Sequence, residues 1–305
     1  MKRRSFLQKS AIATSLLSLG KFPLNAFSNK EFVKLTILHT NDVHSRVERF
    51  PNDGSRNAGL GGAARRASLI KDIRKREANV LLLDAGDIFQ GTPYFNFFGG
   101  ELEFKLMSEM KYDAATIGNH DFDAGIDGLA KQLPNANFPL VISNYDFSNT
   151  VMNGKTKDHL IFEKQGIKIG VFGIGISLPG LVPATLFKET QSLDPIATAN
   201  SFAGRLKKDE ACDFVICLSH LGFKYRSNEL VSDHVLAEAS EHIDLIIGGH
   251  THTFLDEAVV IKNRKGKSIM INQVGWAGIL LGRIDVYFEK GKGNKCNSCN
   301  NLWIR

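Results

Sequence analysis

The stretch FVKLTILHTNDVHS, residues 32–45, runs from an apolar β-type segment directly into polar residues that can bind a metal ion. The same change recurs four times: residues 80–83 lead into GDIFQG (86–91), residues 114–117 into GNHD (118–121), residues 214–218 into SH (219–220), and residues 243–247 into GGHTH (248–252). Each apolar run is typical of a buried strand. Because ligands bind at the carboxyl ends of strands in open α/β sheets, we expect the five polar groups to converge on one site.

Between these strands the sequence predicts amphipathic helices, at residues 62–76, 101–110, 126–133, 196–208 and 229–239. Further short strands are predicted at residues 160–162, 167–174, 258–261, 268–274 and 280–288. The alternation indicates a mixed α/β sandwich, in which two β-rich halves pack face to face and are covered by helices. With 305 residues, 43% of them apolar, the chain can bury a large core in one such domain or in two small ones.

The N-terminal segment is typical of an export signal. MKRRSFLQK (1–9) carries the pair Arg3 and Arg4, and the apolar stretch that follows at residues 11–19 is too short to span a bilayer. This is the pattern of a twin-arginine signal peptide, and a retained anchor or a chance basic terminus is the alternative. We expect cleavage near residues 26–28, a periplasmic mature protein and no stable membrane insertion.

Most of the net charge lies in this segment. The formal charge is +6, but five of the 38 basic residues and none of the 32 acidic residues fall within residues 1–28. The rest of the chain therefore carries a charge of about +1. A net charge this close to zero does not indicate a basic surface for nucleic acid, so we expect no nucleic-acid partner.

The cysteines do not indicate a metal site. Cys217 lies in an apolar strand and is expected in the core. Cys296 and Cys299 have zinc-like spacing, but a structural zinc needs a second pair of ligands and none lies nearby in the sequence. A local disulfide or two free thiols on the tail are the interpretations left.

The polar groups supply the side chains that two divalent ions need. Asp42 and His44 are two residues apart, so both point to one face if their segment is extended. Asp87 lies in a glycine-flanked loop and has two carboxylate oxygens, so it is predicted to bridge the ions. We assign Asp42, His44, Asp87 and His252 to one ion, and Asp87, Asn119, His220 and His250 to the other. Nitrogen and oxygen ligands suit Zn, Mn, Fe and Co alike.

Five of the nine histidines fall at predicted strand ends, and this conjunction favours a metal site over isolated surface histidines. One of them, His120, is not needed as a ligand and is predicted to be the catalytic acid or a cation facing phosphoryl oxygens. Asp123, three residues later, can hold the His120 ring by accepting from its other nitrogen. The role of Asp121 is left open, and His39 is expected to be a hydrogen-bonded core residue.

Five strings of the sequence resemble those of the calcineurin-like metallophosphoesterases, and within them the branch of 5′-nucleotidases and UDP-sugar hydrolases. The strings are ILHTNDVHS (37–45), GLGGAAR (59–65), DAGD (84–87), GNHDFD (118–123) and GGHTH (248–252). The resemblance implies a four-layer α/β/β/α sandwich, the two-metal site assigned above, and a catalytic dyad of His120 and Asp123. We accordingly expect a signal peptide (1–28), a metallophosphoesterase catalytic domain (29–290) and a polar, loose C-terminal tail (291–305).

The activity that the resemblance implies is hydrolysis of phosphate esters, most simply nucleotides, by a water that two metal ions activate for in-line attack. A thiosulfohydrolase of the same fold and a catalytically idle binding subunit are the alternatives. Family members that act on nucleotides resemble two-domain proteins whose C-terminal domain stacks the base, and nothing after Leu281 is expected to offer such a platform. We therefore predict that a separate polypeptide supplies nucleotide recognition. The alternative is an unpaired phosphoesterase whose own loops, at residues 89–98 or 177–187, select another substrate.

Overall fold

The computed structural model describes residues 32–227, 230–289 and 293–305. Its contacts divide the chain into two units, Met1–Phe32 and Val33–Arg305, and the core lies in the second. The predicted signal peptide, residues 1–28, lies outside the described residues. None of the helices in the described part of the chain combines the length and the apolarity that a membrane span needs.

The first sheet carries three of the predicted site strands. β1 (Phe32–Thr40), β2 (Val80–Asp84) and β3 (Ala114–Ala115) are parallel neighbours. On the other side of β1 the sheet continues with β12 (Leu280–Glu289), against which β13 (Gly293–Cys299) and β14 (Leu302–Trp303) pair antiparallel. The carboxyl ends of β1, β2 and β3 therefore share one edge of the sheet.

The second sheet carries the other two site strands, β8 (Phe214–Ser219) and β9 (Leu245–Gly248). They run parallel to each other and to their outer neighbours, β6 (Ile167–Ile174) and β11 (Ser268–Asn272). The edges are antiparallel strands, β5 (His159–Lys164) and β10 (Val259–Lys262). A short separate pair joins β4 (Tyr145–Asp146) to β7 (Gln191–Ser192).

The helices fall largely where the periodicity predicts them. They are α2 (Ala63–Arg76), α3 (Pro93–Phe98), α4 (Glu101–Glu109), α5 (Gly125–Gln132), α6 (Ala184–Phe187), α7 (Pro195–Lys208) and α8 (Asp233–Ala239), with 3₁₀ turns η1 (His120–Phe122) and η2 (Leu133–Asn135). α8 begins later than residue 229 because the Ser232 side chain accepts from the Val235 N–H and caps it. α3 and α6 were not predicted, since each is too short to show a helical period.

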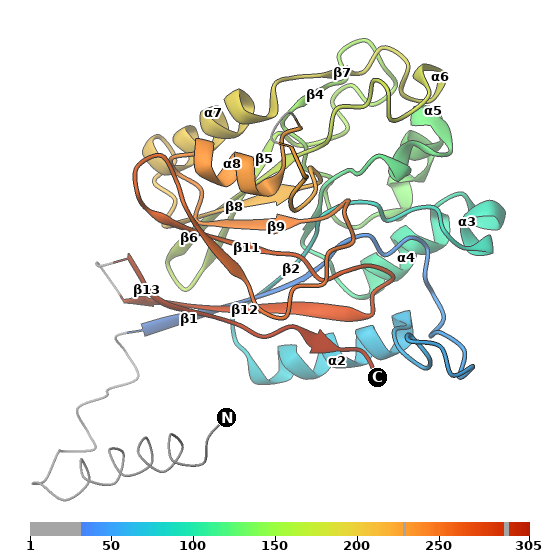
Figure 1. The fold of residues 1–305 in the computed structure, drawn as a ribbon, viewed down its shortest axis with the longest axis horizontal. Helices are drawn as coiled ribbons and strands as arrows, with labels where there is room; N and C mark the ends of the chain where they lie inside the picture. Colours follow the sequence, from blue (N-terminus) through green and yellow to red (C-terminus); the bar gives the residue numbers. More distant parts are fainter. Residues whose placement is uncertain (1–31, 228–229, 290–292) are drawn as a thin grey trace, which may run out of the picture. The chain divides into compact units, whose positions relative to one another are not determined.

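Three apolar cores separate four layers. In β1, Val33, Leu35 and Ile37 face a core shared with the second sheet, whereas Leu38 faces a core shared with helices α2, α4 and α5. A third core lies between the second sheet and helices α7 and α8. Figure 1 shows α2 beneath the first sheet and α7 and α8 above the second. Successive side chains of a strand point to opposite faces of its sheet, so each sheet packs against helices on one face and against the other sheet on the other face. The result is the predicted α/β/β/α sandwich.

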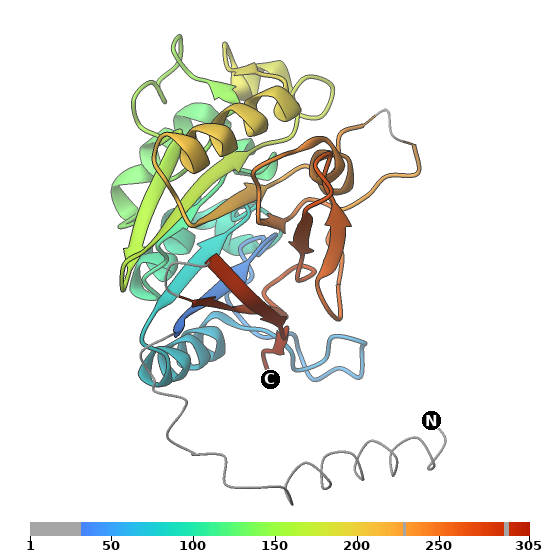
Figure 2. The same cartoon turned by 90° about the vertical axis from the view of Figure 1, so that its left-hand side faces the viewer.

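The predicted loose tail is wrong for residues 293–305. They form β13 and β14, and Ile304 is buried, with its N–H donating to the Ile279 carbonyl oxygen at 2.9 Å. The Ile304 carbonyl oxygen accepts from the Gly61 N–H at 2.8 Å, and in Figures 1 and 2 the C-terminus lies near the loop of residues 50–60. A polar composition does not exclude a strand, because the ladder is made of backbone hydrogen bonds.

Two core predictions are confirmed. His39 is completely buried, accepts from Asn272 Nδ2 at its Nε2 (2.8 Å), and has its pKa lowered to about 3 by burial. Cys217 is also completely buried. Cys299 is a half-buried free thiol, so it does not form the suggested disulfide; the Cys296 side chain lies outside the described residues.

Candidate metal centre

The loops that follow the five site strands bring six of the seven predicted ligands into two groups. Within each group the candidate ligand atoms lie within 4.8 Å of one another. One group contains Asp42, His44 and His252, and the other contains Asp87, His220 and His250. The seventh residue, Asn119, contacts the second group, because its Oδ1 lies 2.8 Å from His250 Nδ1.

In the first group two imidazoles face each other. His44 Nε2 lies 2.9 Å from His252 Nε2, and His252 Nε2 lies 3.4 Å from Asp42 Oδ1. His44 Nδ1 is 3.2 Å from the Phe89 carbonyl oxygen, so this nitrogen carries the proton and Nε2 presents a lone pair. Ring nitrogens turned toward one carboxylate oxygen in this way are arranged as cation ligands.

In the second group the His220 ring is completely buried. His220 Nδ1 donates to the Ala85 carbonyl oxygen at 2.7 Å, whereas Nε2 has no hydrogen-bond partner among the described residues and lies 3.0 Å from Asp87 Oδ2. Burial opposes protonation of His220, yet Asp87 and Asp42 raise its pKa to about 10. The same negative field would attract a metal ion, so an orphaned, oriented nitrogen in this field fits a metal ligand.

Asp87 lies between the two groups. Its Oδ2 is 3.0 Å from His220 Nε2 and 3.8 Å from His44 Nε2. Its Oδ1 accepts from the His120 N–H at 2.8 Å, which fixes the orientation of the carboxylate. One oxygen of Asp87 therefore faces the histidines of both groups.

Five of the seven candidate ligands lie in left-handed backbone. Asp42, His44, Asp87, His250 and His252 all have φ values between 49° and 72°. The expectation that Asp42 and His44 share a face of extended chain is therefore wrong: these two side chains meet through a turn. Such backbone costs a non-glycine residue about 1 kcal/mol or more and persists where the surroundings impose it, typically at functional sites.

Gly86 and Gly118 allow the loops that carry Asp87, Asn119 and His220 to approach one another closely. A Cβ on Gly118 would lie 2.2 Å from Asp87 Oδ1, and a Cβ on Gly86 would lie 2.6 Å from the Gly118 nitrogen and 2.9 Å from His220 Nδ1. Any side chain at either position would therefore displace a candidate ligand. The glycines beside Asp87 and Asn119 are required by this close approach.

Asp121, whose role the sequence leaves open, holds the Asp87 loop. Its carboxylate accepts from four backbone N–H groups, those of Asp87, Ile88, Phe89 and Gly118, at 2.8–3.1 Å. Burial, followed by the charge of Asp87, raises its pKa to about 7. Sequence reasoning misses this role because three of the four donors lie more than thirty residues away, and only the adjacency of Asp121 to His120 hints at it.

The segment after β11 also supports the centre, although no motif marks it. Asn41 Nδ2 donates to Asp42 Oδ2 and to the Gly275 carbonyl oxygen, both at 2.6 Å, and Asn41 Oδ1 accepts from the Val274 N–H at 2.9 Å. The Trp276 indole stacks on the His252 ring, with centroids 5.8 Å apart and an interplanar angle of 9°. Trp276 therefore packs against one face of the candidate ligand His252.

His120 stands beside the centre and outside both ligand groups. Its Nδ1 lies 2.9 Å from Asp123 Oδ2, its ring centroid is 5.3 Å from that of His44, and its side chain is 40% exposed. The hydrogen bond to Asp123 raises the pKa of His120, against the opposing effect of partial burial. Nδ1 thus donates to Asp123, which leaves Nε2 for a substrate.

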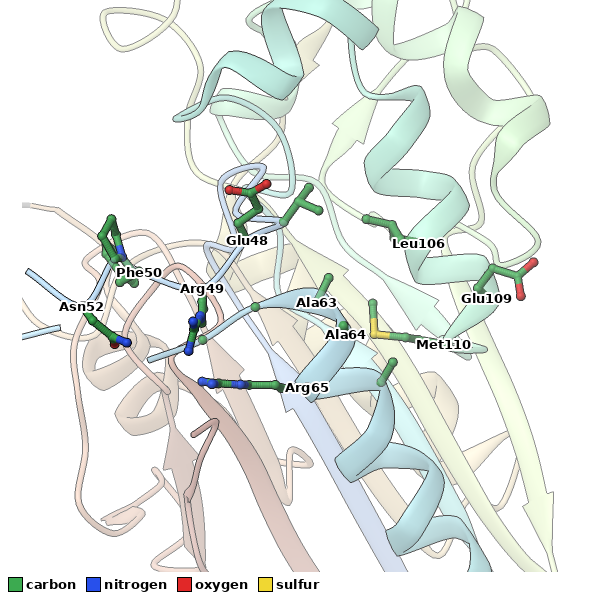
Figure 3. A pocket seen from close by; sticks show the side chains of 15 residues that line it. Glu48, Arg49, Phe50, Asn52, Ala63, Ala64, Arg65, Leu106, Glu109 and Met110 are labelled. Atoms are coloured by element: carbon green, nitrogen blue, oxygen red, sulfur yellow. The ribbon is translucent and has the colours of Figure 1, made fainter. Parts of the chain in front are cut away.

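A cavity of about 890 Å³ lies apart from these ligands, between the loop of residues 47–52, the start of α2 and the end of α4. Figure 3 shows Arg49 and Arg65 on one side of it and Leu106 and Met110 on the other. None of the candidate metal ligands lines it. The candidate metal centre is therefore recognised by the chemistry of its ligand side chains and not by the volume of a cavity.

The chain belongs to the calcineurin-like phosphoesterase family, whose pattern matches residues 35–254. This range contains all seven candidate ligands together with His120 and Asp123.

Individual relatives agree with this assignment. Snake venom 5′-nucleotidase from Crotalus adamanteus is 34% identical over 295 residues, which cover 88% of this chain and 47% of that protein. The 5′-nucleotidase of Homo sapiens is 33% identical over 321 residues, covering 95% and 52%. The crystal structure of a 5′-nucleotidase precursor from Thermus thermophilus matches with a TM-score of 0.78 and 30% identity, covering 89% of this chain and 54% of that one. The chain thus spans about half the length of these relatives.

Proposed function

We propose that the chain is a dinuclear metal-dependent phosphoesterase that hydrolyses nucleotides. The observation that carries the proposal is the position of Asp87, one oxygen of which faces His220 of one ligand group and His44 of the other. A carboxylate so placed can bridge two cations. The relatives named 5′-nucleotidase support the substrate class.

Each ligand group would hold one ion. Asp42, His44 and His252 would bind the first and Asn119, His220 and His250 the second, with Asp87 shared. Two such ions supply Lewis acidity toward phosphoryl oxygens and lower the pKa of water at the site. The strained loops and the carboxylate of Asp121 keep the ligand side chains in place before substrate arrives.

His120 would stabilise the negative charge of the reacting phosphoryl group or protonate the leaving group. Because Asp123 accepts from Nδ1 and raises the pKa of the ring, His120 can carry a second proton on Nε2. From there it can donate a hydrogen bond to a phosphoryl oxygen or give the proton to the leaving alkoxide. Asp123 orients the ring and stays outside the proton transfer.

A substrate screen tests this function. Metal-loaded chain is assayed against nucleoside monophosphates, nucleotide sugars, cyclic nucleotides and thiosulfonates, and we expect release of phosphate from nucleoside monophosphates. Cleavage of thiosulfonates without cleavage of phosphate esters would identify the thiosulfohydrolase alternative. Metal binding without turnover of any of these compounds would identify the idle binding subunit.

We also propose that the chain is exported to the periplasm through its twin-arginine signal. The support is the sequence itself: Arg3 and Arg4 precede a short apolar stretch. Replacing both by lysine keeps the charge and should abolish export of the full chain, as measured by fractionation of expressing cells. Undiminished periplasmic protein in this variant would contradict the twin-arginine assignment.

Recognition of the nucleoside by a separate polypeptide remains a prediction. If a partner supplies the base-binding energy, the isolated chain should hydrolyse small phosphate esters but show a high KM for AMP. A micromolar KM for AMP in the isolated chain would show that no partner is needed.

A further inference from the structure

We propose that a pocket beside His252 binds the flat, aromatic part of the leaving group, which for a nucleotide is the nucleobase. The pocket has a volume of about 460 Å³. Its lining includes three aromatic residues, Phe254, Trp276 and Trp303, and three charged ones, Arg56, Asp256 and Arg305. We call it the aromatic pocket. This inference rests on the proposed phosphoesterase function and adds a subsite for the substrate's leaving group.

The aromatic pocket is joined to the candidate metal centre by one side chain. Trp276 lines the pocket and also stacks in parallel on His252, at 5.8 Å between centroids. Phe254, a second lining residue, follows His252 by two positions. The aromatic pocket is therefore separated from a candidate ligand of the first group by the Trp276 ring. We propose that the leaving group of an ester bound at that group extends along Trp276 into the pocket.

The pocket is assembled from four distant parts of the chain. The C-terminal residues close one side: Leu280 pairs with Trp303 in the ladder, and Asn301 Nδ2 donates to the Leu255 carbonyl oxygen at 2.7 Å. Phe254 packs over Gly275, where a Cβ would lie 2.3 Å from its ring. The Phe50 ring contacts Trp276 edge-on at 5.9 Å. These contacts order the aromatic walls in advance, which lowers the entropic cost of binding a flat ligand.

The surfaces that the pocket offers suit a nucleobase. Phe254 is 37% exposed and Trp303 is 49% exposed, although both are large aromatic side chains. Bases stack on such side chains with little dependence on sequence, because every base has a π-face. The Arg305 guanidinium lies 5.5 Å from the centre of the Trp303 ring, and with Arg56 it outweighs the single negative charge of Asp256. The positive balance favours a leaving group attached to phosphate.

Trp303 thus corrects the expectation that nothing after Leu281 offers a base-stacking platform. The expectation fails because β14 folds back along β12 and places Trp303 in the pocket that Trp276 lines. Neither residues 89–98 nor residues 177–187, the loops considered as selectors of another substrate, line this pocket. Selectivity for the base can therefore reside in this chain, which is the alternative to its recognition by a separate polypeptide; a low KM for AMP in the isolated chain would favour the aromatic pocket.

Binding can be measured without turnover, because the chain's two tryptophans, Trp276 and Trp303, both line the pocket. Intrinsic tryptophan fluorescence of the full, metal-loaded chain therefore reports on it directly. We expect adenosine to quench this fluorescence saturably and ribose to leave it unchanged. No saturable quenching by adenosine would overturn the proposal, whether or not the chain is an active phosphoesterase.

The kinetic test compares two esters that differ only by the base, AMP and ribose 5-phosphate. In Trp303→Ala the ratio of kcat/KM for AMP to that for ribose 5-phosphate should fall about tenfold, through a higher KM for AMP. Phe254→Ala should lower the same ratio. Phe32→Ala is the matched control, because Phe32 is 48% exposed but does not line the pocket, and it should leave the ratio unchanged.

The outcomes separate the subsite from the function. The subsite is overturned if neither Trp303→Ala nor Phe254→Ala changes the ratio of kcat/KM for AMP to that for ribose 5-phosphate. Such a result would leave the phosphoesterase function intact. Saturable quenching by adenosine in a chain that hydrolyses neither ester would support the pocket and contradict the proposed function. If Trp303→Ala fails to fold, as judged by circular dichroism, Phe254→Ala and the fluorescence titration decide the question.

Discussion

Asp87→Ala should bind markedly less metal than the unmodified chain and should show no measurable turnover of phosphate esters. The Asp87 carboxylate faces His220 Nε2 at 3.0 Å and His44 Nε2 at 3.8 Å, so its loss removes a ligand from both groups at once. It also leaves the buried His220 beside less negative charge, which weakens the attraction for a cation. Metal content by elemental analysis and initial rates with AMP measure the two effects.

The matched control for this variant is Asp72→Ala. Asp72 lies on α2, its side chain is 61% exposed, and its ion pair with Lys75 is on the surface, so its removal should change neither metal content nor rate. Two tightly bound ions in Asp87→Ala would show that Asp87 does not bridge the centre. Circular dichroism of both variants establishes that the fold is retained.

His120→Asn should retain both metal ions and the fold but lower kcat by about 10²- to 10⁴-fold, the usual effect of losing a catalytic acid or base. The residue lies outside both ligand groups, and only its backbone N–H contacts Asp87, at 2.8 Å. Asparagine keeps that N–H, so metal binding should be preserved. Steady-state kinetics together with metal analysis of the same preparation measure the prediction.

Asp123→Asn should cause a smaller loss of kcat than His120→Asn. Asp123 fixes the ring through its 2.9 Å contact with Nδ1 and does not carry the transferred proton. A near-normal kcat in His120→Asn would show that the histidine is structural. A larger loss in Asp123→Asn than in His120→Asn would contradict the division of roles between them.

The architecture could be predicted because it follows from short-range patterns. A two-residue alternation in β1 and β2 separates the side chains that face the second sheet, such as Leu35, from those that face the helices, such as Leu38. Polar residues after each apolar run place the candidate ligands at strand ends. These features are local in sequence, so they can be recognised without knowing which strands are neighbours.

The details of the centre could not be predicted, because they depend on contacts between distant segments. The left-handed φ of Asp42 and His252 is imposed by the surrounding loops, and nothing in an Asp-x-His or His-x-His pair specifies it. Asp121 has its role only because the loop of Asp87 presents N–H groups to it. The aromatic pocket is likewise invisible in the sequence, since Arg56, Trp276 and Trp303 become neighbours only when the C-terminal strand folds back.

The central claim is that two metal ions act together at the ligand groups around Asp87. Its most direct test is a titration of chelator-treated chain with Mn²⁺, in which bound metal and the rate of AMP hydrolysis are measured at each addition. We predict no turnover without metal and full turnover only when two ions are bound per chain. Full turnover in the metal-free chain, or a rate that reaches its maximum with one bound ion, would contradict the account.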